Sequence, residues 1–227
     1  MKVIETIHID KIYEGVVPVH AVDNVSIAIE EGEFTAIVGP SGSGKTTLLN
    51  IIGGLDRPSS GQIIVNGTDI SQLSNNELID FRLKNIGFVF QSYNLIPVLT
   101  AKENVEFVML LQNRSKEERD ARVTELLEAV GLGDRTNNRP NQMSGGQQQR
   151  VAVARALASK PGFILADEPT ANLDSASTSN LLDIMADLNK KENITFVFST
   201  HDQRVIDRAR RVITLEDGKI VSDITKS

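Results

Sequence analysis

The sequence contains no cysteine. Without thiol side chains, the chain can form neither a disulfide framework nor a cysteine-based metal site. It also lacks an apolar run of the roughly 18 to 20 residues that a bilayer-spanning helix needs. Its longest apolar runs, such as residues 107–111, are of a length that suits a protein core. We therefore expect no direct membrane insertion, and any membrane role must come through a partner.

Clusters of basic residues are missing as well. The chain has 24 Lys and Arg residues against 30 Asp and Glu residues, a formal net charge of -6 and a pI near 5.2. Because nucleic-acid binding proteins neutralise phosphates with clustered basic side chains, this balance argues against a nucleic-acid partner. With 227 residues, 40% of them hydrophobic, the chain can bury a sizeable core as one domain.

Residues 1–90 mostly predict short strands separated by turns. Alternation in VDNVSIAIEE leads into the continuous apolar run FTAIV before a glycine, a pattern typical of a buried strand. Asn66-Gly67 follows another apolar run and predicts a tight turn. Together these signals indicate an antiparallel sheet around one parallel strand.

From residue 91 to about residue 155 the pattern is helical. Residues 115–118 form a capping box, and Gly131 stands where a helix C-terminus favours glycine. Strand and helix then alternate, with a strand expected over 162–166, a helix over 176–190, a strand over 194–200, a helix from Asp202 and a hairpin about Asp217-Gly218. That alternation predicts a parallel, doubly wound α/β sheet, in which ligands bind at the carboxyl ends of the strands.

The segment GPSGSGKT, residues 39–46, fits the pattern G-x-x-x-x-G-K-[ST]. It lies between the strand FTAIV and the helical pattern TLLNIIGG, the context that a phosphate-binding loop requires. Glycines let backbone N–H groups turn toward phosphate oxygens, and the helix N-terminus adds its positive dipole. We expect Lys45 to reach the β- and γ-phosphates and the Thr46 hydroxyl to bind Mg²⁺. The residues expected to contact the nucleotide here are Gly39, Ser41, Gly42, Ser43, Gly44, Lys45, Thr46 and Thr47.

Two acids, Asp167 and Glu168, follow the apolar run GFILA. Adjacent strand residues point to opposite faces, so we expect different roles for them. Asp167 is a candidate for the Mg²⁺ shell, and Glu168 for polarising a water in line with the γ-phosphate. His201, after the run ITFVFST, is a third residue at a strand end, where a γ-phosphate contact is wanted. Acids that cap the next helix and a structural histidine are the alternatives.

These motifs, taken in order, resemble the motif set of ABC ATPases. The set consists of GPSGSGKTT, the glutamine of VFQS, MSGGQ, ILADE, NLD and STHD. The resemblance covers essentially the whole chain. It implies a P-loop NTPase with a RecA-like parallel-sheet core, an N-terminal antiparallel β subdomain and an inserted helical subdomain. Residues 1–227 then form one domain, with the helical subdomain at 91–155 between core segments 1–90 and 156–227.

The resemblance also implies a role for each motif residue, with ATP and Mg²⁺ as cofactors. Tyr13 would stack on adenine, and Gln91 would contact Mg²⁺ and water while sensing a transmembrane partner. Glu168 would be the catalytic base, His201 the γ-phosphate switch and Lys45 a phosphate ligand. In a head-to-tail, ATP-dependent homodimer, the MSGGQ segment would face the nucleotide of the other subunit and Asp174 would reach across the interface. The MSGGQ residues concerned are Ser144, Gly145, Gly146 and Gln147.

Longer stretches narrow the resemblance to one branch. LLNIIGGLDRPSSG, SGGQQQRVAVARALA and ADEPTANLDS are similar to the lipoprotein-release and macrolide-exporter type, close to a cell-division ATPase. Met143 replaces the usual Leu, and Ala171 stands where this branch commonly has Gly. The branch implies a permease partner with about four transmembrane helices, and a peripheral location on the cytoplasmic face of the inner membrane.

Three other functions remain as alternatives. A regulatory ATPase of cell division would share the same motifs. A soluble ABC-type ATPase of DNA maintenance would carry long coiled-coil or zinc insertions, which this sequence does not have. A single-site P-loop kinase or GTPase would leave MSGGQ and NLD unexplained.

Overall fold

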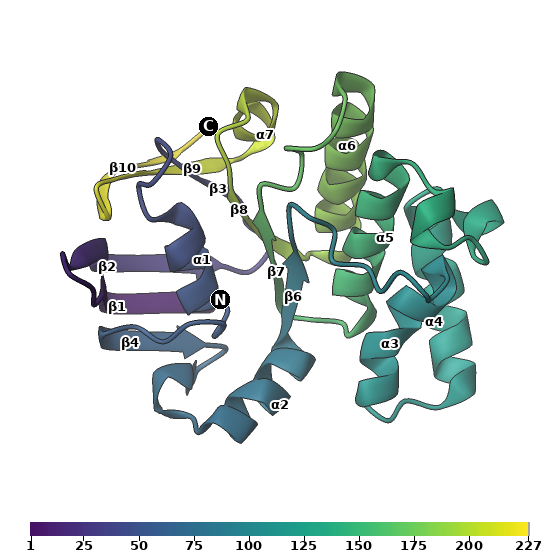
Figure 1. Cartoon of the computed structure of the whole chain (residues 1–227), viewed down its shortest axis with the longest axis horizontal. Helices are drawn as coiled ribbons and strands as arrows, with labels where there is room; N and C mark the ends of the chain where they lie inside the picture. The colour runs from purple at the N-terminus through teal and green to yellow at the C-terminus, as the bar shows by residue number, and fades with distance from the viewer. Residues whose placement is uncertain (227) are drawn as a thin grey trace.

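The computed structural model describes residues 1–226, and the strands in this range form two sheets (Figure 1). A four-stranded sheet has the order β2-β1-β4-β5, and its neighbouring strands pair antiparallel. Asn66 and Gly67 join β4 to β5 with positive φ angles of 48° and 79°, which confirms the predicted tight turn. The strands of this sheet are β1 (Lys2–Tyr13), β2 (Val19–Glu30), β4 (Ser60–Val65) and β5 (Thr68–Asp69).

The second sheet in this range has six strands in the order β10-β9-β3-β8-β7-β6. Pairing is parallel from β9 to β6, whereas β10 runs antiparallel to β9 and forms the predicted C-terminal hairpin. The parallel part confirms the predicted doubly wound core. Its strands are β3 (Phe34–Val38), β6 (Ile86–Val89), β7 (Phe163–Asp167), β8 (Thr195–Ser199), β9 (Arg211–Glu216) and β10 (Lys219–Thr225).

One expectation for the N-terminal segment is wrong, because no parallel strand lies inside the antiparallel sheet within residues 1–226. The chain turns at Gly32, with a φ of 76°, and β3 enters the other sheet between β8 and β9. A continuous apolar run suits that place because a central parallel strand is covered on both faces. The change of sheet after β2 puts the end of β3, and hence the phosphate loop, at the centre of the parallel sheet.

The helices gather mainly on the side of the molecule away from the four-stranded sheet, where α3, α4 and α5 form a lobe (Figure 1). No helix within residues 1–226 combines the length and apolarity that a membrane span requires. The α-helices are α1 (Lys45–Ile52), α2 (Asn75–Asn85), α3 (Ala101–Leu111), α4 (Lys116–Ala129), α5 (Gly145–Ala158), α6 (Ser175–Glu192) and α7 (Gln203–Arg208). Short 3₁₀ turns lie at Ile70–Gln72, Gly133–Arg135 and Pro140–Gln142.

The pattern of short strands over residues 1–90 does not predict helix α2. Its signal is a capping box in which the Ser74 hydroxyl accepts from the Glu77 N–H and the Glu77 carboxylate accepts from the Ser74 N–H. Leu78 is the one buried residue of this helix. The apolar periodicity is therefore too weak to mark the helix, and the capping pattern Ser-x-x-Glu carries the information.

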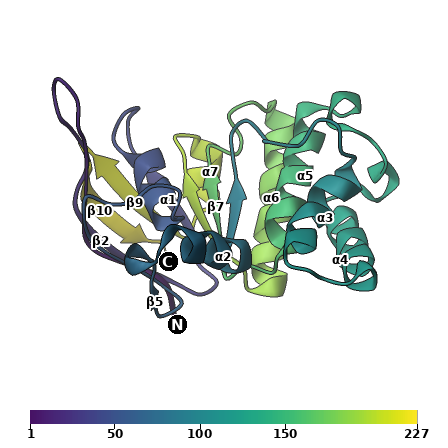
Figure 2. The ribbon, with the colours of Figure 1, turned by 60° about the horizontal axis from the view of Figure 1, so that its bottom comes forward.

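Two hydrophobic clusters form the core. One lies between the four-stranded sheet, α1 and the parallel sheet, and contains Ile51, Leu165 and Ile213. The other runs from the helical lobe through α5 and α6 to the opposite face of the parallel sheet, and contains Leu126 and Phe198. Helix α5 continues to Ala158, three residues beyond the expected end of the helical segment. In Figure 2, α6 and α5 lie between β6 and the helices α3 and α4, and apolar residues of α5 belong to the same cluster as those of the lobe and the sheet.

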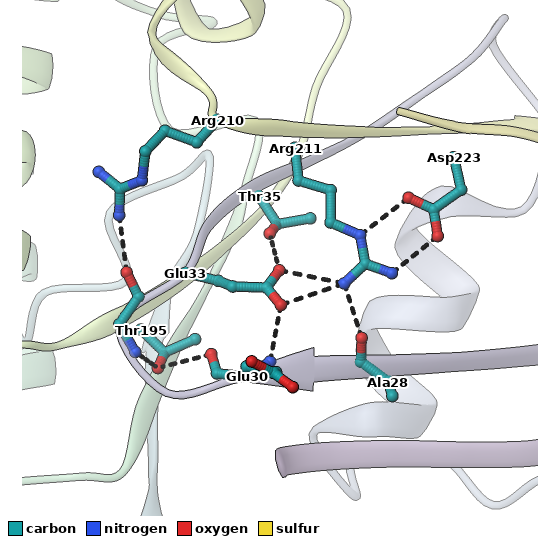
Figure 3. A network of polar contacts seen from close by, with 9 residues as sticks. Ala28, Glu30, Glu33, Thr35, Thr195, Arg210, Arg211 and Asp223 are labelled. Carbon is teal, nitrogen blue, oxygen red and sulfur yellow. Dashed lines mark hydrogen bonds and ion pairs between the residues drawn. The ribbon is translucent and has the colours of Figure 1, made fainter. Parts of the chain in front are cut away.

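An ion-pair network fixes the C-terminal hairpin to the rest of the sheet (Figure 3). The Arg211 guanidinium donates to both Asp223 oxygens at 2.8 and 2.7 Å, and to both Glu33 oxygens at 3.1 Å. These contacts, that with Asp223 first, raise the pKa of Arg211. Arg211 also donates to the Ala28 carbonyl at 2.7 Å. The network joins β10, β9, β2 and the turn before β3, and so secures the strand that leads into the phosphate loop.

Candidate nucleotide site

The phosphate loop connects the end of β3 to α1, as predicted. Gly39 and Gly44 have φ angles of 149° and 99°, which favour glycine. A side chain at Gly39 would collide with the Leu215 carbonyl oxygen, and one at Gly44 with the Ala21 carbonyl oxygen. Gly44 is also the N-cap of α1 and offers no side-chain cap. The first N–H groups of α1 are therefore left to a ligand, because a helix has no partners of its own for them.

Lys45 begins α1, and its side chain folds back over the loop. The ammonium donates to the Gly39 and Pro40 carbonyls, at 2.9 Å each. Ser43 is buried, and its hydroxyl has no hydrogen-bond partner within residues 1–226. A positive side chain and an unsatisfied hydroxyl in the loop before the uncapped N-terminus of α1 fit a phosphate group.

Thr46 and Asp167 bring the two predicted metal ligands together. The Thr46 hydroxyl, in the first turn of α1, donates to Asp167 Oδ1 at 3.0 Å, and Asp167 ends strand β7. Mg²⁺ takes few protein ligands, usually one or two oxygens together with phosphate and water. The paired hydroxyl and carboxylate beside the phosphate loop fit that donor set, and Gln91, in the turn after the neighbouring strand β6, adds an amide oxygen.

Glu168 points differently from Asp167, but the reason given by the sequence is wrong. Strand alternation does not apply, because β7 ends at Asp167 and Glu168 has a left-handed φ of 44°. Its carboxylate is held on both oxygens, with His201 Nδ1 at 2.6 Å from Oε1 and the Thr200 hydroxyl donating to Oε2 at 3.2 Å. The Glu168 side chain is 15% exposed, whereas that of His201 is 75% exposed. The turn thus presents a mostly buried carboxylate at the carboxyl edge of the sheet.

Most of the predicted site residues surround one cavity of about 510 Å³. It is open on the carboxyl side of the sheet and combines the phosphate loop with the ends of β6, β7 and β8. The sequence separations are bridged because these parallel strands end at the same edge. The predicted residues that line it are Gly39, Ser41, Gly42, Gly44, Lys45, Thr46, Thr47, Gln91, Glu168 and His201. Ala171 lines it as well.

Tyr13 is the last residue of β1, just before the segment that joins β1 to β2. Its hydroxyl donates to Asp56 Oδ2 at 2.8 Å, and the Lys11 ammonium lies 4.8 Å from its ring centroid while pairing with Asp56 Oδ1 at 2.8 Å. Burial, and then the bond to Asp56, raise the pKa of the Tyr13 hydroxyl, and the Thr47 side chain partly offsets this. Tyr13 is 42% exposed, and its hydroxyl is held at the edge of the ring, as a platform for a planar base requires.

Sequence reasoning missed Lys11 and Asp56, and it also missed Thr200. Asp56 follows α1 and lies 43 residues from Tyr13, so no short-range pattern joins them. Thr200 belongs to the motif STHD, in which His201 is the residue predicted to contact the γ-phosphate. A hydroxyl next to a strand-end histidine, aimed back at the preceding strand's carboxylate, becomes apparent when the strands are placed side by side.

The MSGGQ residues do not line this cavity. Ser144 is the N-cap of α5, and its hydroxyl and the Gln147 amide form a reciprocal capping box. Gly146 lies against Ser177, because a Cβ there would be 2.9 Å from the Ser177 hydroxyl oxygen. Asp174 caps α6 and accepts from the Ser177 N–H at 2.9 Å. The two segments that the resemblance places at a dimer interface therefore adjoin each other, outside the cavity of their own chain.

Comparison with known proteins gives concordant results. The family model described as ABC transporter matches residues 22–171. An uncharacterized ABC transporter ATP-binding protein of Thermotoga maritima is 50% identical over 220 residues, which cover 96% of this chain and 94% of that protein. The macrolide export ATP-binding/permease protein MacB of Hyphomonas neptunium is 48% identical over 209 residues, 92% of this chain but 32% of that protein. A solved dimeric post-hydrolysis structure of the ATP-binding cassette MJ0796, bound to ADP and Pi, has a TM-score of 0.91 and 44% identity, with 99% of each chain covered.

A glycine-rich loop between a central parallel strand and a helix, with carboxylates at the end of a neighbouring strand, defines a P-loop nucleoside triphosphatase. The chain belongs to the ABC transporter family. It is an ATP-binding cassette that uses ATP and Mg²⁺ and hydrolyses ATP. The phosphate loop and the carboxylates show that the chain is a P-loop nucleoside triphosphatase. The similarity to ABC transporter proteins over most of the chain shows the family.

Proposed function

We propose that this chain is the motor subunit of a membrane complex, dimerises head to tail on ATP, and drives a permease of the lipoprotein-release or macrolide-export type. The observation that carries this proposal is the match of nearly the whole chain to about one third of fused ATP-binding/permease proteins. The chain corresponds to a part of these proteins, and we propose that it works with a permease of the same type. Its place would be peripheral, at the cytoplasmic face of the inner membrane.

Within one subunit, the cavity residues divide the work of hydrolysis. Glu168 accepts a proton from the attacking water, and His201 and Thr200 hold its carboxylate in place. Lys45 leaves the loop carbonyls for phosphate oxygens, where its charge stabilises the transition state together with the N–H groups of α1. Thr46, Asp167 and Gln91 would hold Mg²⁺, which supplies further neutralisation of phosphate charge when bound. Tyr13 stacks on the adenine ring of ATP.

The second half of the site comes from the other subunit. In-line attack on a phosphoryl group benefits from charge stabilisation on both sides of the transferred group. The N-terminus of α5, with Gly145 and Gly146 in its first turn, carries N–H groups suited to that task. Its position outside its own cavity, next to Asp174, supports a role in the partner's site. Because ATP then binds the closed dimer more tightly, hydrolysis can do work on the permease.

The surface over residues 92–105 and α3 supports docking of a permease segment. Val98 is 71% exposed, and Leu110 and Leu111 of α3 are 49% and 53% exposed. Beside them a groove of about 260 Å³ is lined by Phe88, Phe90, Asn94, Val108 and Arg155, among others. Exposed apolar groups beside a groove suit an amphipathic helix. The chain that follows Gln91 would in this way report a docked partner to the cavity.

Replacing Glu168 by Gln tests the proposal. The amide keeps the size of the side chain but cannot accept the proton, so we expect turnover to fall at least about 100-fold with ATP binding unchanged. Gel filtration should show an ATP-stabilised dimer. Glu31→Gln, at an exposed turn, is the matched control and should behave as the unaltered chain does. Normal hydrolysis by Glu168→Gln would refute the assignment of the base.

The same variant, held in its ATP state, should capture the partner from membranes. We expect a co-purifying permease with about four transmembrane helices and a large extracytoplasmic domain. Recovery of a permease with a different architecture would reject the proposed branch, and recovery of a soluble coiled-coil partner would reject the membrane role.

A further inference from the structure

Gln149 joins the signature helix α5 to two loops that carry site residues. Its side chain is fully buried, at 0% exposure. The Nε2 group donates to the Pro169 carbonyl at 2.8 Å and, more weakly, to the Phe90 carbonyl at 3.4 Å. Pro169 directly follows Glu168, and Phe90 directly precedes Gln91. One side chain, five residues after Ser144, thus binds the backbone next to both residues.

Two further side chains hold the same loop beyond Gln91. Asn172 donates to the Gln91 carbonyl at 3.0 Å. Arg155, also on α5, donates to the carbonyls of Tyr93, at 2.8 Å, and Asn94. Tyr93 and Asn94 have left-handed φ angles of 55° and 51°, so this irregular segment depends on side chains to fix its path. The loop around Gln91 is therefore attached at several points to α5 and to the segment after Glu168.

Gln149 keeps these bonds although one end of its amide is unsatisfied. Its Oε1 atom is buried and has no hydrogen-bond partner within residues 1–226. A buried oxygen without a partner lowers stability, so an apolar side chain of the same length would fill the space without that cost. The donor end, with its two carbonyl partners, is the part of the residue that packing does not explain.

We propose that Gln149, with Arg155 and Asn172, is a positioning residue that holds Gln91 and the Glu168 turn to the signature helix. This inference rests on the proposed roles of Gln91 and Glu168. We propose that the N-terminus of α5 docks on the partner's nucleotide. The hydrogen bonds of Gln149 would then transmit this docking to Glu168 of the same subunit. The base in one site would then respond to the nucleotide in the other.

The decisive experiment compares Gln149→Met with Gln148→Met. The two residues are neighbours on α5, but the Gln148 amide donates to the Met143 carbonyl within the signature segment, at 3.1 Å. For Gln149→Met we expect kcat to fall at least about tenfold while the KM for ATP stays within about twofold, because misplaced catalytic groups slow the chemical step more than binding. The substitution removes the unsatisfied Oε1 but leaves the buried Pro169 carbonyl without this donor, so we expect a slightly lower melting temperature in a chain that is still folded at the assay temperature.

Asn172→Ala is the second variant, since Asn172 is exposed and its loss cannot disturb the core. It should also lower kcat, by a smaller factor, without changing the KM. In the Glu168→Gln background, Gln149→Met should still form the ATP-stabilised dimer. A kcat within twofold of the unaltered chain in both variants would overturn the proposal. So would a loss of stability or of dimerisation that accounts for the lower rate. If the unaltered chain itself fails to hydrolyse ATP, the proposed function fails instead.

Discussion

Helices α1 and α5 both start next to small residues, but their N-termini differ in how their N–H groups are satisfied. At α1 the N-cap is Gly44 in a left-handed conformation, and no side chain caps the first turn. At α5 the N-cap is Ser144, whose hydroxyl accepts from Gln147 while the Gln147 side chain accepts from Ser144. The first end is left to a ligand and lies inside a cavity, whereas the second is partly satisfied and lies outside it.

The difference indicates that the two N-termini do not compete for one phosphate. The loop before α1 has its own lysine and its own metal-ligand pair, so it can bind a nucleotide within a single subunit. Within the signature segment, residues 143–147, there is neither a lysine nor a metal-ligand pair. The capping box satisfies part of the first turn of α5 without a ligand. We therefore expect variants of the first region to change the nucleotide affinity of the single subunit, and variants of the second to spare it.

Lys45→Ala should have the largest effect. Without the ammonium, the β- and γ-phosphates lose a charged ligand, so we expect ATP affinity to fall at least about tenfold and turnover at least about 100-fold. Equilibrium binding of a fluorescent ATP analogue and a phosphate-release assay measure the two quantities. Lys190→Ala, an exposed lysine on α6, serves as the control. Unchanged affinity would mean that the loop does not hold the nucleotide in the expected way.

Ser144→Arg should abolish ATP-dependent dimerisation and hydrolysis while leaving nucleotide binding by the single subunit within about twofold. The bulky charge would block the surface that we propose meets the partner's nucleotide. Ser115→Arg is a close control, because Ser115 forms the same kind of capping box on α4 and its loss also costs about 1 kcal/mol. If Ser144→Arg lost nucleotide binding, α5 would belong to its own site and the contrast with α1 would fail.

Asp56→Ala should have the smallest effect. It tests whether the residues that hold Tyr13 contribute to nucleotide binding by the single subunit. Removing the carboxylate takes away the acceptor of the Tyr13 hydroxyl and one of the two partners of the Lys11 ammonium, which keeps its bond to the Arg57 carbonyl. The Tyr13 ring is then held less firmly. We expect a three- to tenfold loss of ATP affinity, about 1 kcal/mol, with turnover at saturating ATP nearly unchanged. Isothermal titration with Asp80→Ala as an exposed control measures this. An unchanged affinity would show that the platform needs no support.

Much of the site could be predicted because it is built from short contiguous motifs. The residues 39–47 carry their own loop geometry, and Gln91, Glu168 and His201 each follow an apolar strand, so their convergence follows from the parallel sheet. The prediction failed where local rules compete. Strand alternation predicts that the Glu168 side chain points away from that of Asp167. The strand ends at Asp167, however, and the left-handed φ of Glu168 sets the direction of its side chain. Helix α2 was missed because it buries one residue.

The chemistry of the loop, the carboxylates and the signature segment follows from the amino-acid sequence alone, because each depends on residues within a few positions of one another. The tertiary structure decided what surrounds them. The bond from Tyr13 to Asp56, that from Thr200 to Glu168 and those from Gln149 to two loops join residues 20 to 59 positions apart. Such contacts have no periodicity and no spacing rule, since the strand order brings their partners together. The Tyr13 bond depends on the packing of β1 against the segment after α1, and the other two depend on the packing of α5 and the strands of the parallel sheet.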